Sequence, residues 1–184
     1  MDPIIKSDLY RYGGLSGMKG FIKGIISIPG FRYTFLLRKV QKHNNHPIRR
    51  SFYKILKRRL SIKYGFQIPS EVQIGKGFYI GHYGTVIINP NAKIGENCNI
   101  SPGVTVGQAN RGWIKGYPTI GNRVWMGTNS VIIGKINIGS NVLIAPNSTV
   151  SIDVPDNSMV RGNPAKIVET EDATDGYINY CLEL

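Results

Sequence analysis

The sequence of 184 residues lacks the features that define several common protein classes. Its two cysteines, Cys98 and Cys181, are too few for a disulfide framework. No apolar stretch is long enough to cross a bilayer, and no cleavable signal pattern opens the chain. We therefore expect a cytoplasmic protein, and the length allows one domain with a small extension.

Acidic residues are almost missing from the first third of the chain. Residues 1–66 contain 15 Lys and Arg but two acidic residues, whereas residues 67–184 contain eight Lys and Arg and nine acidic residues. Apolar residues recur at helical spacing over 31–42 and 48–63, so residues 1–66 are expected to form a basic α-helical region. We expect these helices to pack on the rest of the protein. Peripheral contact of residues 31–63 with an anionic membrane is kept as an alternative. No nucleic-acid partner is expected, because no signature of a nucleic-acid-binding fold accompanies the charge.

An aliphatic residue at every sixth position dominates the remainder of the chain. Such hexapeptides are typical of a parallel β-helix, in which three repeats form one triangular coil and coils stack about 4.8 Å apart. The pattern skips between positions 106 and 120, so residues 107–119 are predicted to leave the prism as one protruding loop. We therefore expect a mainly β domain over 67–168 and an acidic C-terminal tail over 169–184. The repeated positions are Ile68, Ile74, Ile80, Val86, Ile88, Ile94, Ile100, Val106, Ile120, Met126, Ile132, Ile138, Ile144 and Val150.

One of the three histidines interrupts this repeat. His82 follows Ile80 and Gly81, where small and aliphatic residues prevail. A neutral imidazole is suited to act as a general base near neutral pH. His43 and His46 lie in a turn-like stretch between the expected helices, so we expect them to be exposed. His82 is therefore the candidate catalytic residue.

Four segments resemble serine acetyltransferases and related hexapeptide O-acetyltransferases, including those that modify capsular polysaccharides. The resemblance implies a left-handed β-helix, a homotrimer, acetyl-CoA as donor, active sites in the grooves between subunits and His82 as general base. It implies no metal. The same prism occurs in γ-type carbonic anhydrases, but these need a cluster of histidine ligands, and His82 stands alone in the repeats. The matching segments are IGKGFYIGHYGTVI (74–87), ISPGVTVG (100–107), GYPTIG (116–121) and RGNPAKIV (161–168).

The resemblance also implies which residues contact the two substrates. The expected acetyl-CoA contacts are Gly107, Gly127, Thr128, Ala145, Arg161 and Lys166. The expected contacts of the acceptor are Tyr83, Trp113, Tyr117 and Gln67.

The chain departs from serine acetyltransferases at residues that hold the amino acid. Gly81 stands where that family has an aspartate before the base, and Gly116 stands where it has an arginine. Gln67 replaces the aspartate that orients the base. Because these charges recognise a zwitterion, we expect a saccharide hydroxyl as acceptor, in capsule, exopolysaccharide or O-antigen synthesis. The alternatives are a serine O-acetyltransferase of cysteine synthesis and a non-catalytic trimeric scaffold that docks on membranes.

Overall fold

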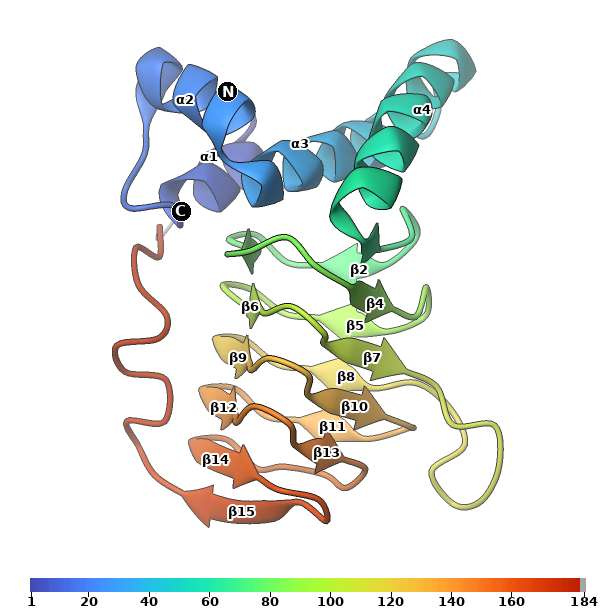
Figure 1. The fold of residues 1–184 in the computed structure, drawn as a ribbon, viewed down its shortest axis with the longest axis vertical. Coiled ribbons are helices and arrows are strands. Elements are labelled where there is room, and N and C mark those ends of the chain that lie inside the picture. The colour runs from blue at the N-terminus through green and yellow to red at the C-terminus, as the bar shows by residue number, and fades with distance from the viewer. Residues whose placement is uncertain (183–184) are drawn as a thin grey trace.

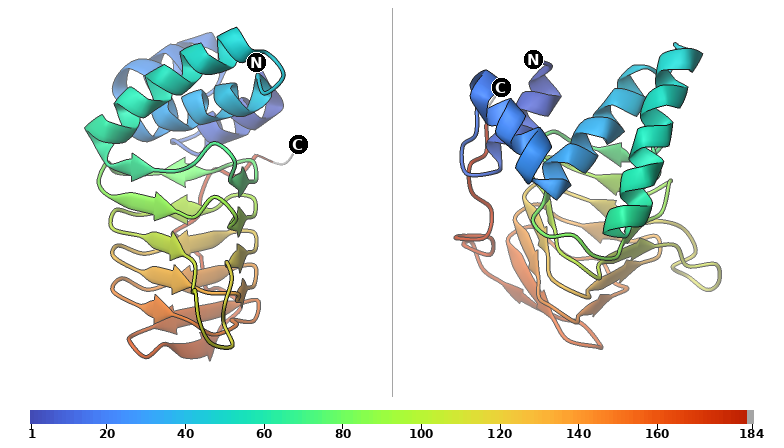
Figure 2. Two further views of the ribbon diagram at one scale, coloured as in Figure 1. Left: turned by 90° about the vertical axis from the view of Figure 1, so that its right-hand side faces the viewer. Right: turned by 45° about the horizontal axis from the view of Figure 1, so that its top comes forward.

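The computed structural model describes residues 1–182 and shows a β prism with α-helices over one end (Figure 1). The predicted fold class is confirmed: a left-handed parallel β-helix with an N-terminal helical segment and one protruding loop. The loop leaves the prism between β7 (Thr105–Gly107) and β8 (Thr119–Ile120) and is closed by an antiparallel bridge between Ala109 and Gly116. It projects from the side of the prism in Figure 1 and in the right-hand view of Figure 2.

Four helices form a helical cap over residues 3–64. They are α1 (Pro3–Tyr10), α2 (Gly17–Ser27), α3 (Pro29–Lys42) and α4 (Pro47–Tyr64). α1, α3 and α4 each begin at a proline, whose fixed φ suits the first helical position and whose missing N–H is not needed there. α3 and α4 cover the two helices expected from the sequence, whereas α1 and α2 were not anticipated. None of the described helices combines the length and apolarity needed to cross a bilayer.

Each of the first four coils contributes one short strand to each of three sheets, named here after their first strands. The β1 sheet contains β1 (Phe66–Gln67), β4 (Val86–Ile88), β7 (Thr105–Gly107), β10 (Val131–Ile133) and β13 (Thr149–Val150). The β2 sheet contains β2 (Gln73–Ile74), β5 (Lys93–Ile94), β8 (Thr119–Ile120) and β11 (Asn137–Ile138). The β3 sheet contains β3 (Tyr79–Ile80), β6 (Asn99–Ile100), β9 (Val124–Met126), β12 (Val142–Ile144), β14 (Ser158–Arg161) and β15 (Lys166–Glu169). All pairs are parallel except β14 with β15.

The aliphatic residues of the repeat point inward and form one continuous core. Successive coils stack them in register, as Ile80 pairs with Ile100 and Ile100 with Met126. Tyr33 and Leu37 of α3 join the same core, so the helical cap and the prism are packed as one body. Burial of apolar side chains at about 25 cal/mol per Å² is the main force that holds the coils together.

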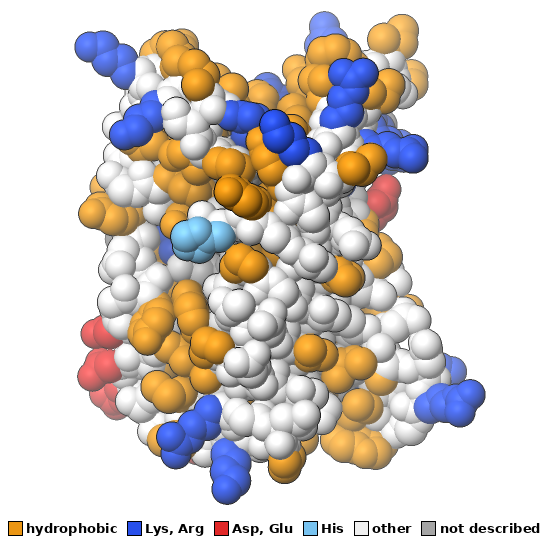
Figure 3. All heavy atoms as spheres, viewed as in Figure 1, with side chains coloured by type: hydrophobic (Ala, Val, Ile, Leu, Met, Phe, Trp, Pro, Cys, Tyr) orange, Lys and Arg blue, Asp and Glu red, His pale blue; other side chains and the backbone are white. Residues whose placement is uncertain are grey.

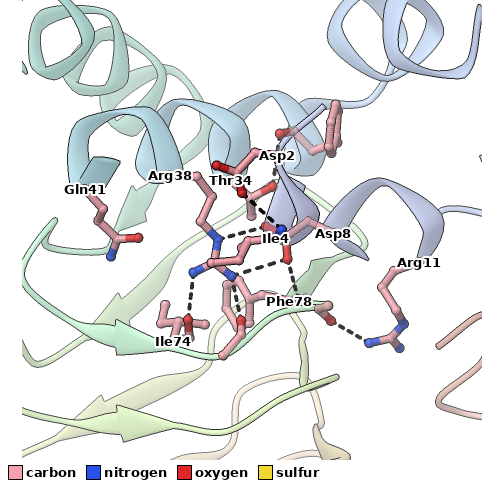
Figure 4. Close-up of polar contacts among 12 residues, drawn as sticks. Asp2, Ile4, Asp8, Arg11, Thr34, Arg38, Gln41, Ile74 and Phe78 are labelled. Atoms are coloured by element: carbon pink, nitrogen blue, oxygen red, sulfur yellow. Dashed lines mark hydrogen bonds and ion pairs between the residues drawn. The ribbon is translucent and has the colours of Figure 1, made fainter. Parts of the chain in front are cut away.

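A buried ion pair fastens the helical cap to the first coil (Figure 4). Arg38 of α3 donates to Asp8 of α1 at 2.9 Å and to the carbonyls of Ile74 and Gly75 at 2.7 and 2.6 Å. The Asp8 carboxylate also accepts from the Phe78 backbone N–H at 2.9 Å. Burial raises the pKa of Asp8, and the Arg38 guanidinium acts in the opposite direction. The pair therefore satisfies backbone groups at the top of the prism that no further coil covers.

The C-terminal segment is ordered against the prism. After β15, residues 170–182 run back along the β3 sheet to the helical cap (Figure 1). Ala173, Thr174 and Ile178 are buried, and the Thr174 hydroxyl donates to the Asn141 side chain at 2.6 Å. Near the cap, the Arg11 guanidinium donates to the Asn179 carbonyl at 2.9 Å. This strap, residues 170–182, therefore covers part of the β3 sheet's outer surface.

Candidate active site

One edge of the prism collects most of the residues expected at the active site. At this edge the chain passes from the β3 sheet to the β1 sheet, and we call it the His82 edge. Strand register stacks Ile80, Ile100, Met126, Ile144 and Val160 on successive coils. The residues that follow these five are therefore also stacked along the edge: Gly81, Ser101, Gly127, Ala145 and Arg161.

His82 and Thr128 belong to the next column of the same edge. With one coil step of about 4.8 Å, the first and fifth coils are separated by roughly 19 Å along the prism. Small residues occupy the edge between its two ends: Ser101, Gly127 and Ala145. Arg161 lies at the far end and pairs with Lys166 in the antiparallel register of β14 and β15. The structure thus aligns the candidate base with five of the six expected acetyl-CoA contacts, while the sixth, Gly107, lies elsewhere.

His82 borders a cavity of about 340 Å³ beside this edge. Its side chain is exposed, and among the described residues no hydrogen bond reaches the imidazole. Ser101, Pro102 and Thr128 of the His82 edge line the same cavity. A histidine that no internal partner occupies is free to accept a proton from a bound hydroxyl.

The strap supplies the opposite wall of this cavity. Tyr177 packs against Trp125 with ring centroids 4.8 Å apart, and both rings line the cavity with Tyr79. The Asn99 side-chain amide donates to the Tyr177 carbonyl at 2.9 Å. The side-chain oxygen of Asn99, Oδ1, in turn accepts a hydrogen bond from the Arg11 guanidinium at 2.6 Å. The buried Arg11 guanidinium therefore connects the cap, the strap and the wall of the cavity.

The helical cap buttresses the strand that carries His82. The Tyr12 hydroxyl accepts from the Ile80 backbone N–H at 3.2 Å and donates to its carbonyl at 3.1 Å. Burial raises the pKa of Tyr12, so this phenol stays neutral. Gly30 at the start of α3 lies directly against the same carbonyl. These contacts determine where β3 ends and hence where the next residues, Gly81 and His82, are placed.

Other expected residues are placed apart from His82 within one chain. Gly107 lies at the opposite end of the β1-sheet strands, where the protruding loop begins. Trp113 and Tyr117 are on that loop and exposed, Trp113 at 82 %. Gln67 lies exposed in β1, on the outer surface of the β1 sheet. Tyr83 is next to His82 but 69 % exposed.

The sequence did not predict that Tyr79, Trp125 and Tyr177 would line the cavity. A signal was present for two of them, because Tyr79 and Trp125 each precede an inward residue and so occupy the same outward column of the β3 sheet. Tyr177 carried no such signal, because it lies in the strap outside the repeats. Cys98 is buried in the core, and burial raises the pKa of its thiol to about 12. That value argues against Cys98 as a nucleophile.

Comparison with known proteins identifies the family. The family model of the bacterial transferase hexapeptide (six repeats) matches residues 117–151. Serine acetyltransferase of Neisseria gonorrhoeae, solved in complex with serine, superimposes with a TM-score of 0.72 at 30 % identity. That alignment covers 90 % of this chain and 67 % of the other. The chain belongs to the hexapeptide-repeat transferases.

Two further members of this family extend the comparison. Serine acetyltransferase 4 of Arabidopsis thaliana is 33 % identical over 154 residues, which are 84 % of this chain and 41 % of the plant protein. Serine acetyltransferase of Brucella abortus, solved in complex with coenzyme A, has a TM-score of 0.75 at 26 % identity, covering 91 % of this chain and 67 % of that one. The chain spans only about two fifths to three fifths of the curated relatives it matches.

These comparisons correct one expectation from the sequence. A sugar hydroxyl in surface polysaccharide synthesis was expected as acceptor, because Gly81 and Gly116 lack the charges that bind an amino acid. The relatives named above are serine acetyltransferases, which contradicts that expectation and favours the alternative kept beside it. The charges that bind an amino acid need not stand at those two positions. Other basic residues are present on the protruding loop.

Proposed function

We propose that this protein is an acetyl-CoA-dependent serine O-acetyltransferase with His82 as general base. The observation that carries the proposal is the placement of His82, beside a cavity and at one end of an edge of small residues that ends at Arg161. Its kinship with serine acetyltransferases supports serine as the acceptor. The activity and the substrates are proposals, because the chain spans only part of its curated relatives.

The reaction needs one proton acceptor and one oxyanion site. His82 takes the proton of the serine hydroxyl while the hydroxyl oxygen attacks the thioester carbonyl carbon of acetyl-CoA. A tetrahedral oxyanion forms and collapses, the carbon–sulfur bond breaks, and the protonated imidazole returns its proton to the departing thiolate. General-base catalysis of this kind contributes about 10² to 10⁴ in rate. The backbone N–H groups of Ser101, Gly127 and Ala145 already donate to carbonyls of the next coil. The exposed Thr128 hydroxyl in the cavity is the donor that is suited to hold the oxyanion.

The His82 edge suits a long, thin donor. Glycine and alanine at positions 127 and 145 have no large side chain, which leaves room beside the prism for an extended chain. The Thr128 side chain is exposed beside them and can donate or accept a hydrogen bond. Arg161 and Lys166 at the far end supply positive charge for phosphate groups. The Brucella abortus serine acetyltransferase solved in complex with coenzyme A supports acetyl-CoA as the donor.

The acceptor site requires a second copy of the chain. The loop that carries Trp113 and Tyr117 is at one edge of the β1 sheet, and His82 is at the other. We propose a homotrimer in which the loop of one subunit reaches the His82 cavity of its neighbour. Arg111 and Lys115, both exposed on that loop, then stand in for the missing arginine and pair with the serine carboxylate.

The test is acetyl transfer to L-serine, followed as CoA thiol release and as O-acetylserine by mass spectrometry. His82→Ala should lower kcat by about 10² or more and leave acetyl-CoA binding intact, whereas His46→Ala, far from the prism edge, should behave as wild type. Lys115→Ala should raise the KM for serine. If the wild-type chain forms no O-acetylserine, the acceptor is wrong. Wild-type turnover by His82→Ala rules out this residue as the base.

A trimer can be tested separately by light scattering. A monomeric mass at micromolar protein would contradict the shared site. If acetyl-CoA does not bind to the protein at all, that result would favour the non-catalytic scaffold over any acetyltransferase.

A further inference from the structure

Helix α4 exposes a stripe of apolar side chains to solvent and buries a lysine on the side that faces the protein. Its exposed apolar residues are Ile48, Phe52, Ile55 and Ile62, which are 85, 57, 58 and 78 % exposed. At 3.6 residues per turn these side chains form one stripe, about 140° to 180° around the helix from Lys57. Lys57 is buried and donates to the Ile68 carbonyl at 2.6 Å. A lysine therefore faces the protein while isoleucines face away from it.

Helix α2 carries a second exposed stripe at a spacing of four residues. Met18, Ile22 and Ile26 are 71, 50 and 67 % exposed. An apolar groove of about 290 Å³ lies between α2, α3 and α4. In Figure 1 the two striped helices, α2 and α4, stand at the end of the molecule that is remote from the C-terminal coils. Exposed apolar patches of this extent mark interaction surfaces.

The charge around the stripes has one sign. The 62 positions between Asp8 and Glu71 contain no acidic residue. Arg58, Arg59 and Lys63 lie beside the stripe of α4 and are exposed. Orange and blue side chains accordingly occur together over the helical end in Figure 3. Any partner of this surface must therefore accept both apolar side chains and a dense positive charge.

We propose that the stripes of α2 and α4 dock on an anionic lipid bilayer. A bilayer provides the two properties together: acyl chains for the stripe and lipid phosphates for the flanking cations. A two-fold contact with the same surface of a second copy fits less well, because it would bring two acid-free surfaces together. The surface differs from the one that the sequence suggested, residues 31–63, because α3 is largely buried and α2 takes part in its place.

Vesicle co-sedimentation of the full chain tests the proposal. Vesicles of phosphatidylcholine with about 30 % phosphatidylglycerol should bind the protein, and phosphatidylcholine alone should not. The triple variant Ile48→Ser, Phe52→Ser, Ile55→Ser should weaken binding about tenfold or more. The triple variant Arg58→Glu, Arg59→Glu, Lys63→Glu should weaken it about 10²-fold, since each basic residue near the surface contributes about fivefold.

Matched controls separate docking from folding and from self-association. Ile87→Ser changes an exposed isoleucine on the prism and should leave vesicle binding unchanged. Phe52→Trp should show a blue-shifted emission with anionic vesicles, which reports insertion directly. The proposal is overturned if the wild-type protein does not bind anionic vesicles. It is also overturned if the triple variant Ile48→Ser, Phe52→Ser, Ile55→Ser binds them as wild type does. It is also overturned if that variant has a smaller mass in sedimentation, because the stripe then lies between copies.

Discussion

Glycine at position 30 should be essential for placing His82, and Gly30→Ala tests this. A Cβ at this position would lie 2.0 Å from the Ile80 carbonyl oxygen and 2.7 Å from the Tyr12 hydroxyl. Ordinary contact begins at 3.4 Å, so either α3 or the end of β3 must move by roughly 1 Å. The two hydrogen bonds between Tyr12 and Ile80 would be lost or distorted.

Two magnitudes decide the expected result. Overpacking costs about 1 to 3 kcal/mol, and the higher helix propensity of alanine offsets about 1 kcal/mol of it. We therefore expect the free energy of unfolding to fall by at most about 2 kcal/mol. A displacement of about 1 Å at a catalytic group lowers the rate by about 10²-fold. The effect on turnover should thus exceed the effect on stability.

The assay measures kcat for serine acetylation beside the melting temperature. Gly20→Ala is the control, because a Cβ there meets its nearest neighbour at 3.3 Å, in helix α2 and away from the cavity. It should have wild-type turnover and nearly unchanged stability. Wild-type kcat in Gly30→Ala together with a lowered melting temperature would show that the contact supports the fold alone. If Gly30→Ala has the wild-type kcat and also the wild-type melting temperature, the steric argument itself is refuted.

Three further predictions concern the contacts between the cap, the strap and the prism. Arg38→Ala should lower the free energy of unfolding by about 3 to 5 kcal/mol in chemical denaturation, because it leaves the buried Asp8 carboxylate without its cationic partner. Burial lowers the pKa of Lys57 to about 8 from 10.5, so the unfolded chain binds more protons between these values. Stability should accordingly rise from pH 8 to 9.5, and Lys57→Met should abolish that rise in melting curves. Tyr177→Ala should raise the KM for serine more than the KM for acetyl-CoA, whereas Tyr180→Ala, outside the cavity, should change neither.

The prism was predictable from the sequence because its cause is local and repeated. An inward aliphatic residue every sixth position, such as Ile80 or Ile132, identifies both the coil and the register of its neighbours. The same register predicts that Thr128 and Ala145 lie on the edge of His82. Residues 107–119 were predicted as a loop for the same reason, since the repeat skips there.

The parts of the fold and of the site that were not predicted depend on contacts between segments that share no sequence repeat. Tyr177 contacts Trp125 only because the strap folds back along the prism, and no pattern in the sequence links the two positions. The orientation of α4 was not predictable either, because its pattern has apolar residues on two faces. Leu60 packs on the prism core, while Ile48 stays outside. Helical spacing alone does not tell which of the two faces is buried.

Docking and catalysis should be separable, because they use different parts of the molecule. The cavity beside His82 is walled by the β3 sheet and the strap, and none of its lining residues belongs to α2 or α4. The variant Ile48→Ser, Phe52→Ser, Ile55→Ser should therefore lose vesicle binding and keep the wild-type kcat for soluble serine. His82→Ala should bind anionic vesicles as wild type does while turnover falls. Loss of both properties in either variant would mean that the helical cap and the His82 edge do not act independently.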